Sequence, residues 1–179
     1  NPDTIGITID SGSKITGSAI VKTAVSGGYE CTYTPETALS DGSHTIKIDA
    51  SDNDGNAAVQ KSVTFKIDTV PPTLSITSPA DGLVTNQAAC TVKGATNDAT
   101  SSPVKVTVKL NSGSAENVTV GSDGGFSKVL TLTEGSNTIT IVATDSAGKS
   151  TTVTRTVKLD TSAPVIKSVT LTPNPVDAG

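Results

Sequence analysis

The sequence predicts an all-β protein built from tandem two-sheet sandwiches, and three observations support this. Thirty Thr and nineteen Val, against no Met or Trp, make a composition that favours strands over helices. Apolar and polar residues alternate with a period of two in several segments, as they do in half-buried strands. A long motif also recurs at a spacing near 92 residues, which is too long for a solenoid repeat and typical of tandem sandwich domains.

The repeat is clearest between residues 39–55 and 132–148, where nine of the seventeen aligned positions are identical. An Asp-Thr-x-x-Pro segment, read as a linker, follows each copy. The linker residues are Asp68, Thr69, Pro71 and Pro72 in the first, and Asp160, Thr161 and Pro164 in the second. The sequence therefore predicts a domain over residues 1–68, a complete domain over 69–160, and a linker with the opening strand of a third domain over 161–179.

The complete domain begins with three predicted strands. The first covers residues 73–78 and ends at the turn residues 79–82. The second covers residues 88–94 and places Ala88, Cys90 and Val92 on one face. The third covers residues 104–110, where Val and Leu alternate with Lys and Thr, so this strand is half-buried.

Four more predicted strands complete the domain. A short strand lies at residues 118–120, and an Asp-Gly-Gly turn leads into the next at residues 126–132. Ile139, Ile141 and Ala143 mark the sixth strand, and the turn 145–148 joins it to the seventh at residues 153–159. No apolar period of 3.6 persists in the chain, so essentially no helix is expected.

Seven short strands in about 90 residues, separated by turn residues, describe an immunoglobulin-like sandwich. The motif Gly135-x-x-Thr-Ile-x-Ile-x-Ala-x-Asp-x-x-Gly148, with its Asp-Thr-x-x-Pro linker, resembles the bacterial Ig-like domains. These domains occur in tandem in surface adhesins, secreted polysaccharide enzymes and phage fibres. The strand expected to face Cys90 carries no cysteine, and Cys31 belongs to the other domain, so no disulfide is expected.

Aligned backwards, the first domain has no counterpart to residues 73–94, the first two strands of the complete copy. Two interpretations follow. Either the missing strands precede Asn1, or another segment or subunit donates them, as in strand complementation. The tail, residues 165–171, is itself an unpaired predicted strand and a candidate donor.

The acidic turn at residues 49–56 is a candidate calcium loop, because calcium prefers carboxylate and carbonyl oxygens on tight turns. The alternative is a hairpin turn in which Asp and Asn side chains bond to the backbone. The matching turn at residues 145–148 lacks the additional acid, which favours this alternative. Some bacterial Ig-like arrays bind calcium at domain junctions. That resemblance implies a site made by three acids of the first domain and two residues of the next: Asp52, Asp54, Asp68, Asn97 and Asp98.

Charge and composition exclude several functions. An excess of acidic over basic residues, with a pI of about 4.8, argues against nucleic acid as a partner. No run approaches the roughly 20 apolar residues of a membrane helix, so no membrane insertion is expected. A single histidine, His44, has no recognisable catalytic partners. No enzyme activity and no cofactor other than calcium are therefore expected.

The sequence instead favours a structural spacer or display segment of an extracellular or cell-surface bacterial protein, or of a fibre. Prolines in the linkers restrict bending, and the expected partners are neighbouring Ig-like domains of the same chain. The alternatives are an adhesin or glycan-binding module, or a filament subunit that associates with itself by strand donation. Glycan platforms need exposed aromatic rings, whereas the aromatic residues here are predicted to point inward.

Overall fold

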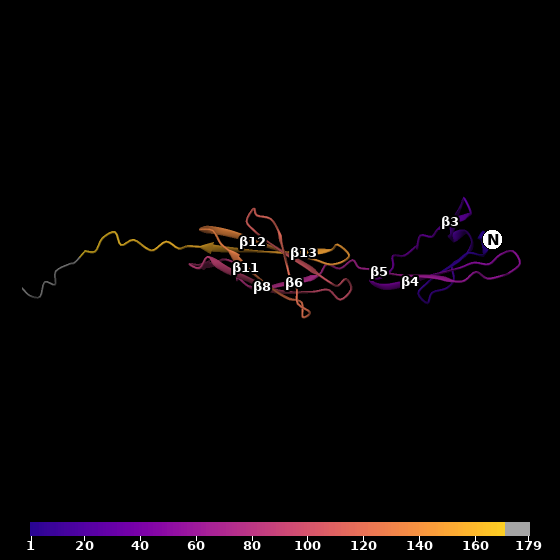
Figure 1. The fold of residues 1–179 in the computed structure, drawn as a ribbon, viewed down its shortest axis with the longest axis horizontal. Helices are drawn as coiled ribbons and strands as arrows, with labels where there is room; N and C mark the ends of the chain where they lie inside the picture. Colours follow the sequence, from indigo (N-terminus) through magenta and orange to yellow (C-terminus); the bar gives the residue numbers. More distant parts are fainter. Residues whose placement is uncertain (171–179) are drawn as a thin grey trace, which may run out of the picture. The chain divides into compact units, whose positions relative to one another are not determined.

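The structure is a computed structural model that describes residues 1–170, and nearly all of its regular elements are strands (Figure 1). The all-β prediction is confirmed, and residues 1–170 contain only two short 3-10 turns, Pro2–Thr4 and Gly17–Ala19. The strands are β1 (Gly6–Ile9), β2 (Val21–Val25), β3 (Gly28–Thr32), β4 (Gly42–Asp49), β5 (Lys61–Ile67), β6 (Thr73–Ser78), β7 (Leu83–Thr85), β8 (Ala89–Asn97), β9 (Lys105–Leu110), β10 (Glu116–Val118), β11 (Gly125–Thr131), β12 (Gly135–Thr144) and β13 (Ser150–Leu159).

The chain divides into two compact units. The first contains Asn1–Thr73 together with two later segments, Thr96–Lys105 and Ala143–Thr151. The second contains Leu74–Ala95, Val106–Val142 and the chain from Thr152 onward. Two loops from the second half of the sequence therefore belong to the same compact unit as the N-terminal half.

The strands from β6 to β13 form the two layers of an immunoglobulin-like sandwich. One sheet has the order β10-β9-β12-β13-β7, and the other has the order β11-β8-β6 (Figure 1). Seven of these eight strands match the predicted ones to within a few residues. The additional strand, β7, was predicted as part of a turn. It has three residues and pairs in parallel with β13, so it leaves no alternating pattern in the sequence.

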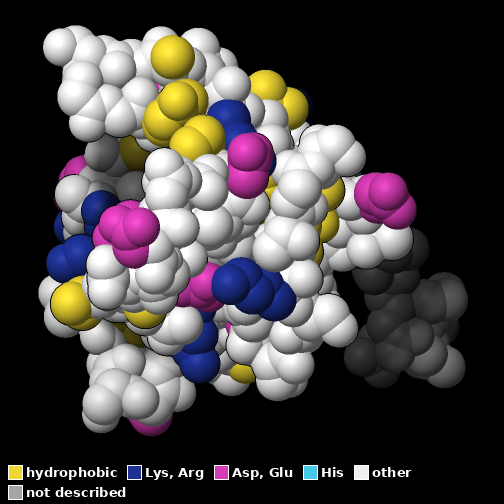
Figure 2. Space-filling model, turned by 90° about the vertical axis from the view of Figure 1, so that its right-hand side faces the viewer, with side chains coloured by type: hydrophobic (Ala, Val, Ile, Leu, Met, Phe, Trp, Pro, Cys, Tyr) yellow, Lys and Arg dark blue, Asp and Glu magenta, His cyan; other side chains and the backbone are white. Residues whose placement is uncertain are grey.

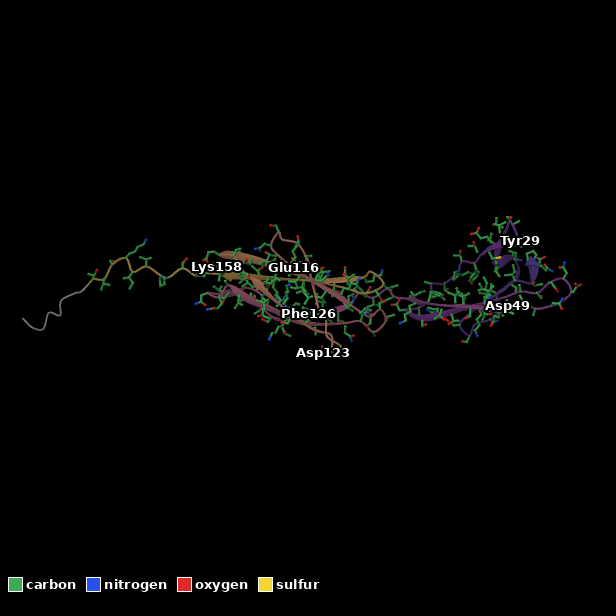
Figure 3. All side chains as sticks on the ribbon, viewed as in Figure 1. Tyr29, Asp49, Glu116, Asp123, Phe126 and Lys158 are labelled. Carbon is green, nitrogen blue, oxygen red and sulfur yellow. The ribbon has the colours of Figure 1, made fainter. Side chains whose placement is uncertain are left out.

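The inward-facing residues of both sheets form the core, as their alternation predicts. Phe126 of β11 lies between the two layers, as Figure 3 shows. A glycine in β8 makes its close approach possible, because a Cβ atom on Gly94 would lie 2.7 Å from the Phe126 ring and 2.3 Å from the Ser75 carbonyl oxygen. The buried apolar side chains of this core are Cys90, Val92, Val106, Val108, Phe126, Leu130, Leu132, Ile139, Ile141, Ala143, Val157 and Leu159.

The N-terminal strands form a three-stranded sheet of order β1-β4-β5 and a β2–β3 hairpin. Residues of these strands are more exposed than their counterparts in the repeat. Ile48 is 41% exposed, whereas the matching Ile141 is fully buried. Tyr29 is 50% exposed, whereas the matching Phe126 is 6% exposed (Figure 3). In the repeat, β11 pairs with β8, whereas the matching β3 pairs with β2.

Residues 161–170 have no strand and are exposed, and the remainder of the predicted third-domain strand, 171–179, lies outside the described residues. The face drawn in Figure 2 mixes acidic, basic and hydrophobic side chains with a large area of other side chains and backbone. No helix among the described residues is long and apolar enough to cross a membrane.

Asn137, at the start of β12, is fully buried and holds the turn that precedes this strand. Its Oδ1 accepts hydrogen bonds from the Thr133 N–H at 3.0 Å and from Asn111 Nδ2 at 3.2 Å. Its Nδ2 donates to the carbonyl oxygens of Thr133 at 2.7 Å and Gly135 at 3.1 Å. The buried amide group of Asn137 therefore finds its hydrogen-bond partners within the protein.

Substituting Asn137→Ala should lower the free energy of unfolding by about 2–4 kcal/mol, because it removes several hydrogen bonds made by a fully buried side chain. The exposed Asn117→Ala provides the control, for which we expect a change within about 0.5 kcal/mol. Chemical denaturation measures both values. Equal effects of the two substitutions would contradict this role of Asn137.

Candidate metal centre

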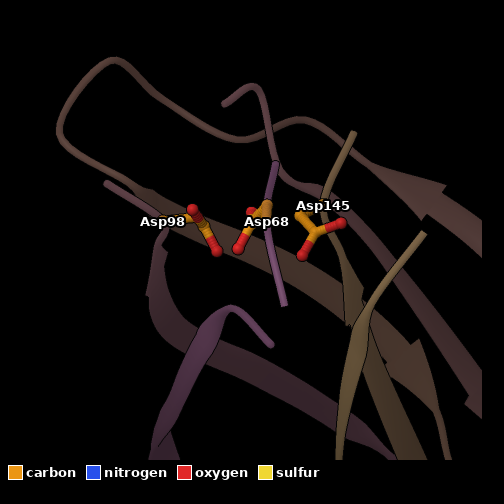
Figure 4. A group of neighbouring side chains, drawn as sticks. All are labelled: Asp68, Asp98 and Asp145. Atoms are coloured by element: carbon orange, nitrogen blue, oxygen red, sulfur yellow. The ribbon is translucent and has the colours of Figure 1, made fainter. Parts of the chain in front are cut away.

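Three aspartates, each the first residue after a strand, bring their carboxylates together. Asp68 follows β5, Asp98 follows β8 and Asp145 follows β12. All three belong to the first compact unit. One carboxylate oxygen from each lies within 4.8 Å of the others, and Figure 4 shows Asp68 between the other two side chains. This group is called the aspartate trio below.

Each aspartate of the trio uses its Oδ1 atom to hold its own turn. Asp68 Oδ1 accepts a hydrogen bond from the Val70 N–H at 3.1 Å. Asp145 Oδ1 accepts one from the Lys149 N–H at 2.9 Å. Asp98 Oδ1 accepts two, from the N–H groups of residues 100 and 101, at 2.8 and 2.7 Å. These Asx-type turns fix the direction of the three side chains.

The Oδ2 atoms of Asp68 and Asp145 are buried and have no hydrogen-bond partner. The two residues are only 9% and 5% exposed, and Asp98 is 9% exposed. No lysine or arginine among the described residues forms a salt bridge with any of the three. Since an unpaired buried carboxylate is costly, the trio has the features of a group that needs a cation.

The chemistry of the trio suits a hard divalent cation. All its ligand atoms are carboxylate oxygens, which calcium and magnesium prefer, and it contains no imidazole or thiolate. Calcium takes six to eight oxygens in a flexible arrangement. Three carboxylates would supply part of such a shell, so backbone carbonyl oxygens or water would have to complete it.

Hydrogen bonds hold the backbone that carries the trio. The Ser146 N–H donates to the Ser101 carbonyl oxygen at 3.1 Å, which joins the loops after β8 and β12. The Thr151 hydroxyl donates to the carbonyl oxygen of Pro72 at 2.6 Å, which joins the start of β13 to the linker. Hydrogen bonds between the loops and the linker therefore fix the backbone positions of the three aspartates.

The structure brings together some of the predicted calcium ligands and not others. Asp68 and Asp98 belong to the trio, and Asn97 directly precedes Asp98 as the last residue of β8. Asp52 and Asp54 lie outside the trio. Asp52 instead caps its own turn, since its carboxylate accepts from Asn56 Nδ2 at 2.8 Å and from the N–H groups of residues 54 and 56. The Asn56 side chain is the main cause of the lowered pKa of Asp52.

The sequence predicts an ordinary turn residue at Asp145, whereas the structure makes it a member of the trio. The repeat contained the signal that could have identified it, because Asp145 aligns with Asp52, which was selected as a candidate ligand. The preference for Asp52 came from the additional acids in its turn, which contribute nothing to the trio. The position in the repeat was more informative than the local density of acids.

The two predicted linkers each make the same kind of contact. The N–H and hydroxyl of Thr69 both donate to the Asp41 carboxylate at 2.9 Å. Thr161 does the same with Glu134, its hydroxyl donating at 2.8 Å. Thr69 is thus bound to the acidic turn before β4, and Thr161 is bound to the equivalent turn before β12. Pro72 is buried, whereas Pro71 and Pro164 are exposed.

Two other features have no connection with the trio. Cys31 and Cys90 are both free thiols, and burial raises the pKa of Cys90. A groove of about 530 Å³ in the N-terminal part is lined by Ile9, Ile15, Tyr33, Pro35, Glu36 and Leu39 among others. It combines apolar and aromatic walls with one carboxylate, which is the composition of many ligand sites.

The chain is similar to several known proteins. Bacillopeptidase F of Bacillus subtilis (strain 168) is 33% identical over 131 residues, which are 73% of this chain and 9% of that protein. The fibronectin(III)-like modules of Clostridium thermocellum CbhA match at 17% identity and a TM-score of 0.42, over 88% of this chain and 77% of theirs. A modular endo-β-1,4-mannanase from Cellulomonas fimi matches at 24% identity and a TM-score of 0.39, over 54% of this chain and 20% of its own.

Family models identify both halves of the chain. The model described as glucodextranase, domain B, matches residues 72–161. The model described as bacterial Ig-like domain matches residues 1–69. These boundaries fall close to the Asp-Thr-x-x-Pro linkers found in the sequence. The chain therefore belongs to the glucodextranase domain B family through residues 72–161, and it carries a second bacterial Ig-like domain in residues 1–69.

Proposed function

We propose that this chain is a structural spacer of a modular extracellular bacterial protein, and that calcium bound by the aspartate trio stiffens it. The observation that carries this proposal is the pair of buried, unpartnered Oδ2 atoms on Asp68 and Asp145. Calcium would supply the positive charge that these carboxylates lack and would complete its shell with backbone or water oxygens.

The position of the trio gives the cation a mechanical role. Asp68 is the first residue of the linker, whereas Asp98 and Asp145 begin two loops of the later sequence. A cation held by all three would fix the start of the linker to these loops. Without it, three carboxylates within 4.8 Å repel one another and favour separation of the segments.

Two further features support a spacer. The Thr69–Asp41 bonds fasten the linker to the turn before β4, and Pro71 and Pro72 restrict its backbone. A linker of this kind loses little entropy when it is held in one conformation. The single histidine of the chain bonds to Asp10 and to a backbone carbonyl group, so it serves the fold and supports no catalytic role.

The groove lined by Tyr33 favours a second candidate function, that of a binding module for a glycan or an adhesin ligand. Tyr29 is also half exposed, in contrast to the inward position expected from the sequence. Aromatic rings at a surface are the usual platform for sugars. A specific glycan-array signal that the substitution Tyr33→Ala removes would place this function above the spacer.

Calcium should raise the melting temperature of the chain by about 5–10 °C over its value in EDTA when calcium is a hundredfold above its dissociation constant. The substitution Asp145→Asn should shift the melting temperature in opposite directions in the two buffers. It removes one negative charge, so it should raise the melting temperature in EDTA and lower it in calcium. Differential scanning calorimetry in both buffers measures the two effects.

The matched control for this experiment is Asp54→Asn, which removes an exposed acid of the neighbouring candidate loop. We expect this variant to respond to calcium as the parent chain does. A parent chain whose melting is the same in calcium and in EDTA would refute the metal site. Loss of the response in Asp54→Asn would move the site to the loop at residues 52–56.

The spacer role makes a separate prediction. Calcium should narrow the distribution of interatomic distances measured by small-angle X-ray scattering, and Pro71→Gly should broaden it, because a glycine frees the linker backbone. Unchanged scattering, together with measured calcium binding, would leave the site in place and reject the spacer function.

A further inference from the structure

The two Ig-like domains hold the same corner with different chemistry. In residues 1–69, Asp10 follows β1 and its Oδ1 accepts a hydrogen bond from the Thr45 N–H at 2.8 Å. In the repeat, Asn111 follows β9 and its Oδ1 accepts from the Thr138 N–H, also at 2.8 Å. Both residues have a positive φ, 54° for Asp10 and 50° for Asn111. The same structural corner is therefore present in both domains, with Asp10 in one and Asn111 in the other.

The partner of this residue is an amide in one copy and an imidazole in the other. Asn111 donates to Asn137, whereas Asp10 faces His44 at the matching position. The Nδ1 atom of His44 lies 2.8 Å from Asp10 Oδ2, and its Nε2 atom lies 2.7 Å from the Ser40 carbonyl oxygen. The His44 side chain is buried.

Both ring nitrogens of His44 thus face oxygen atoms that can only accept. A neutral imidazole carries one N–H and would direct a lone pair at one of these oxygens. The doubly protonated ring donates to both. Asn137 meets the same requirement without a charge, since its Nδ2 atom donates two hydrogen bonds.

We propose that Asp10 and His44 form a pH-dependent clasp, which holds the turn before β4 in the N-terminal domain and weakens when the ring loses its proton. The clasp joins the end of β1 to the segment 40–45. The equivalent corner of the second domain, which is built from two asparagines, keeps its strength over the same range of pH. The two domains therefore respond differently to alkalinity.

The surroundings of His44 agree with this proposal. The charged group that faces the ring is Asp10, directly after β1. From β5 the uncharged ring of Phe65 faces it, with the two ring centroids 5.8 Å apart. Asp41 precedes the ring on its own segment, and its carboxylate is bound to Thr69. The hydrogen bond that the ring donates to Asp10 is the main cause of a raised pKa for His44, and the hydrogen bond from the Thr45 N–H is the main cause of a lowered pKa for Asp10.

These directions fix the pH range of the clasp. A raised His44 pKa contributes stability that is complete below its ordinary value of 6.5 and is lost as the pH rises through the folded value. A lowered Asp10 pKa contributes stability above its ordinary value of 3.8, and this is lost as the pH falls through the folded value. The clasp is strongest between these two ordinary values.

Nuclear magnetic resonance tests the clasp directly, because His44 is the only histidine of the chain. Its imidazole signals should titrate with a pKa above 6.5, and Asp10→Asn should move that pKa down. A parent-chain pKa at or below 6.5 would overturn the proposal without the need for any variant.

Amide hydrogen exchange tests the consequence for the fold. After correction for the intrinsic effect of pH, protection of the Thr45 amide should fall several-fold between pH 6 and 8.5, whereas that of the matching Thr138 amide should not change. The double variant Asp10→Asn with His44→Asn copies the corner of the second domain and should abolish the pH dependence. An equal response of Thr45 and Thr138, or a pH response that survives in the double variant, would refute the clasp.

Discussion

Three carboxylates that are mostly buried and lie within 4.8 Å of one another are the constraint on which this part of the molecule depends. Like charges at this distance repel strongly where water is scarce, and hydrogen bonds to the Oδ1 atoms relieve only part of the cost. The aspartates nevertheless occupy the first position after three different strands. The fold places them there through the strand ends, and this arrangement is the basis of the calcium site that we propose.

Much of the fold could be predicted, because strand alternation and the repeat report on the same sandwich. The core residues of β9, β12 and β13 follow a period of two, and burial of one sheet face enforces that period. β7 could not be found in this way, since its three residues contribute one parallel pairing and little core. Tyr29 is half exposed against expectation, because alternation along a strand does not tell which strands pack beside it: β3 pairs with β2, whereas the matching β11 pairs with β8.

The site was predicted only in part, for a physical reason. Asp68 and Asp98 were identified from the linker and from the loop that follows it, but Asp52 and Asp54 were chosen because acids are dense in their turn. A turn rich in acids can satisfy its carboxylates locally, as Asp52 does with Asn56. Which acids converge depends on which strand ends meet in space, and Asp145 belongs to the trio through that proximity.

The proposed metal site and the proposed clasp show how one fold can be adapted at corresponding positions of its copies. Asp10 and His44 replace two asparagines, and Asp145 stands where Asp52 caps a turn. The central claim, that the trio binds one calcium ion, is tested most directly by native mass spectrometry of the full chain in calcium. We predict one bound ion per chain, and its loss in Asp98→Asn. A parent chain that shows no bound calcium would contradict the account.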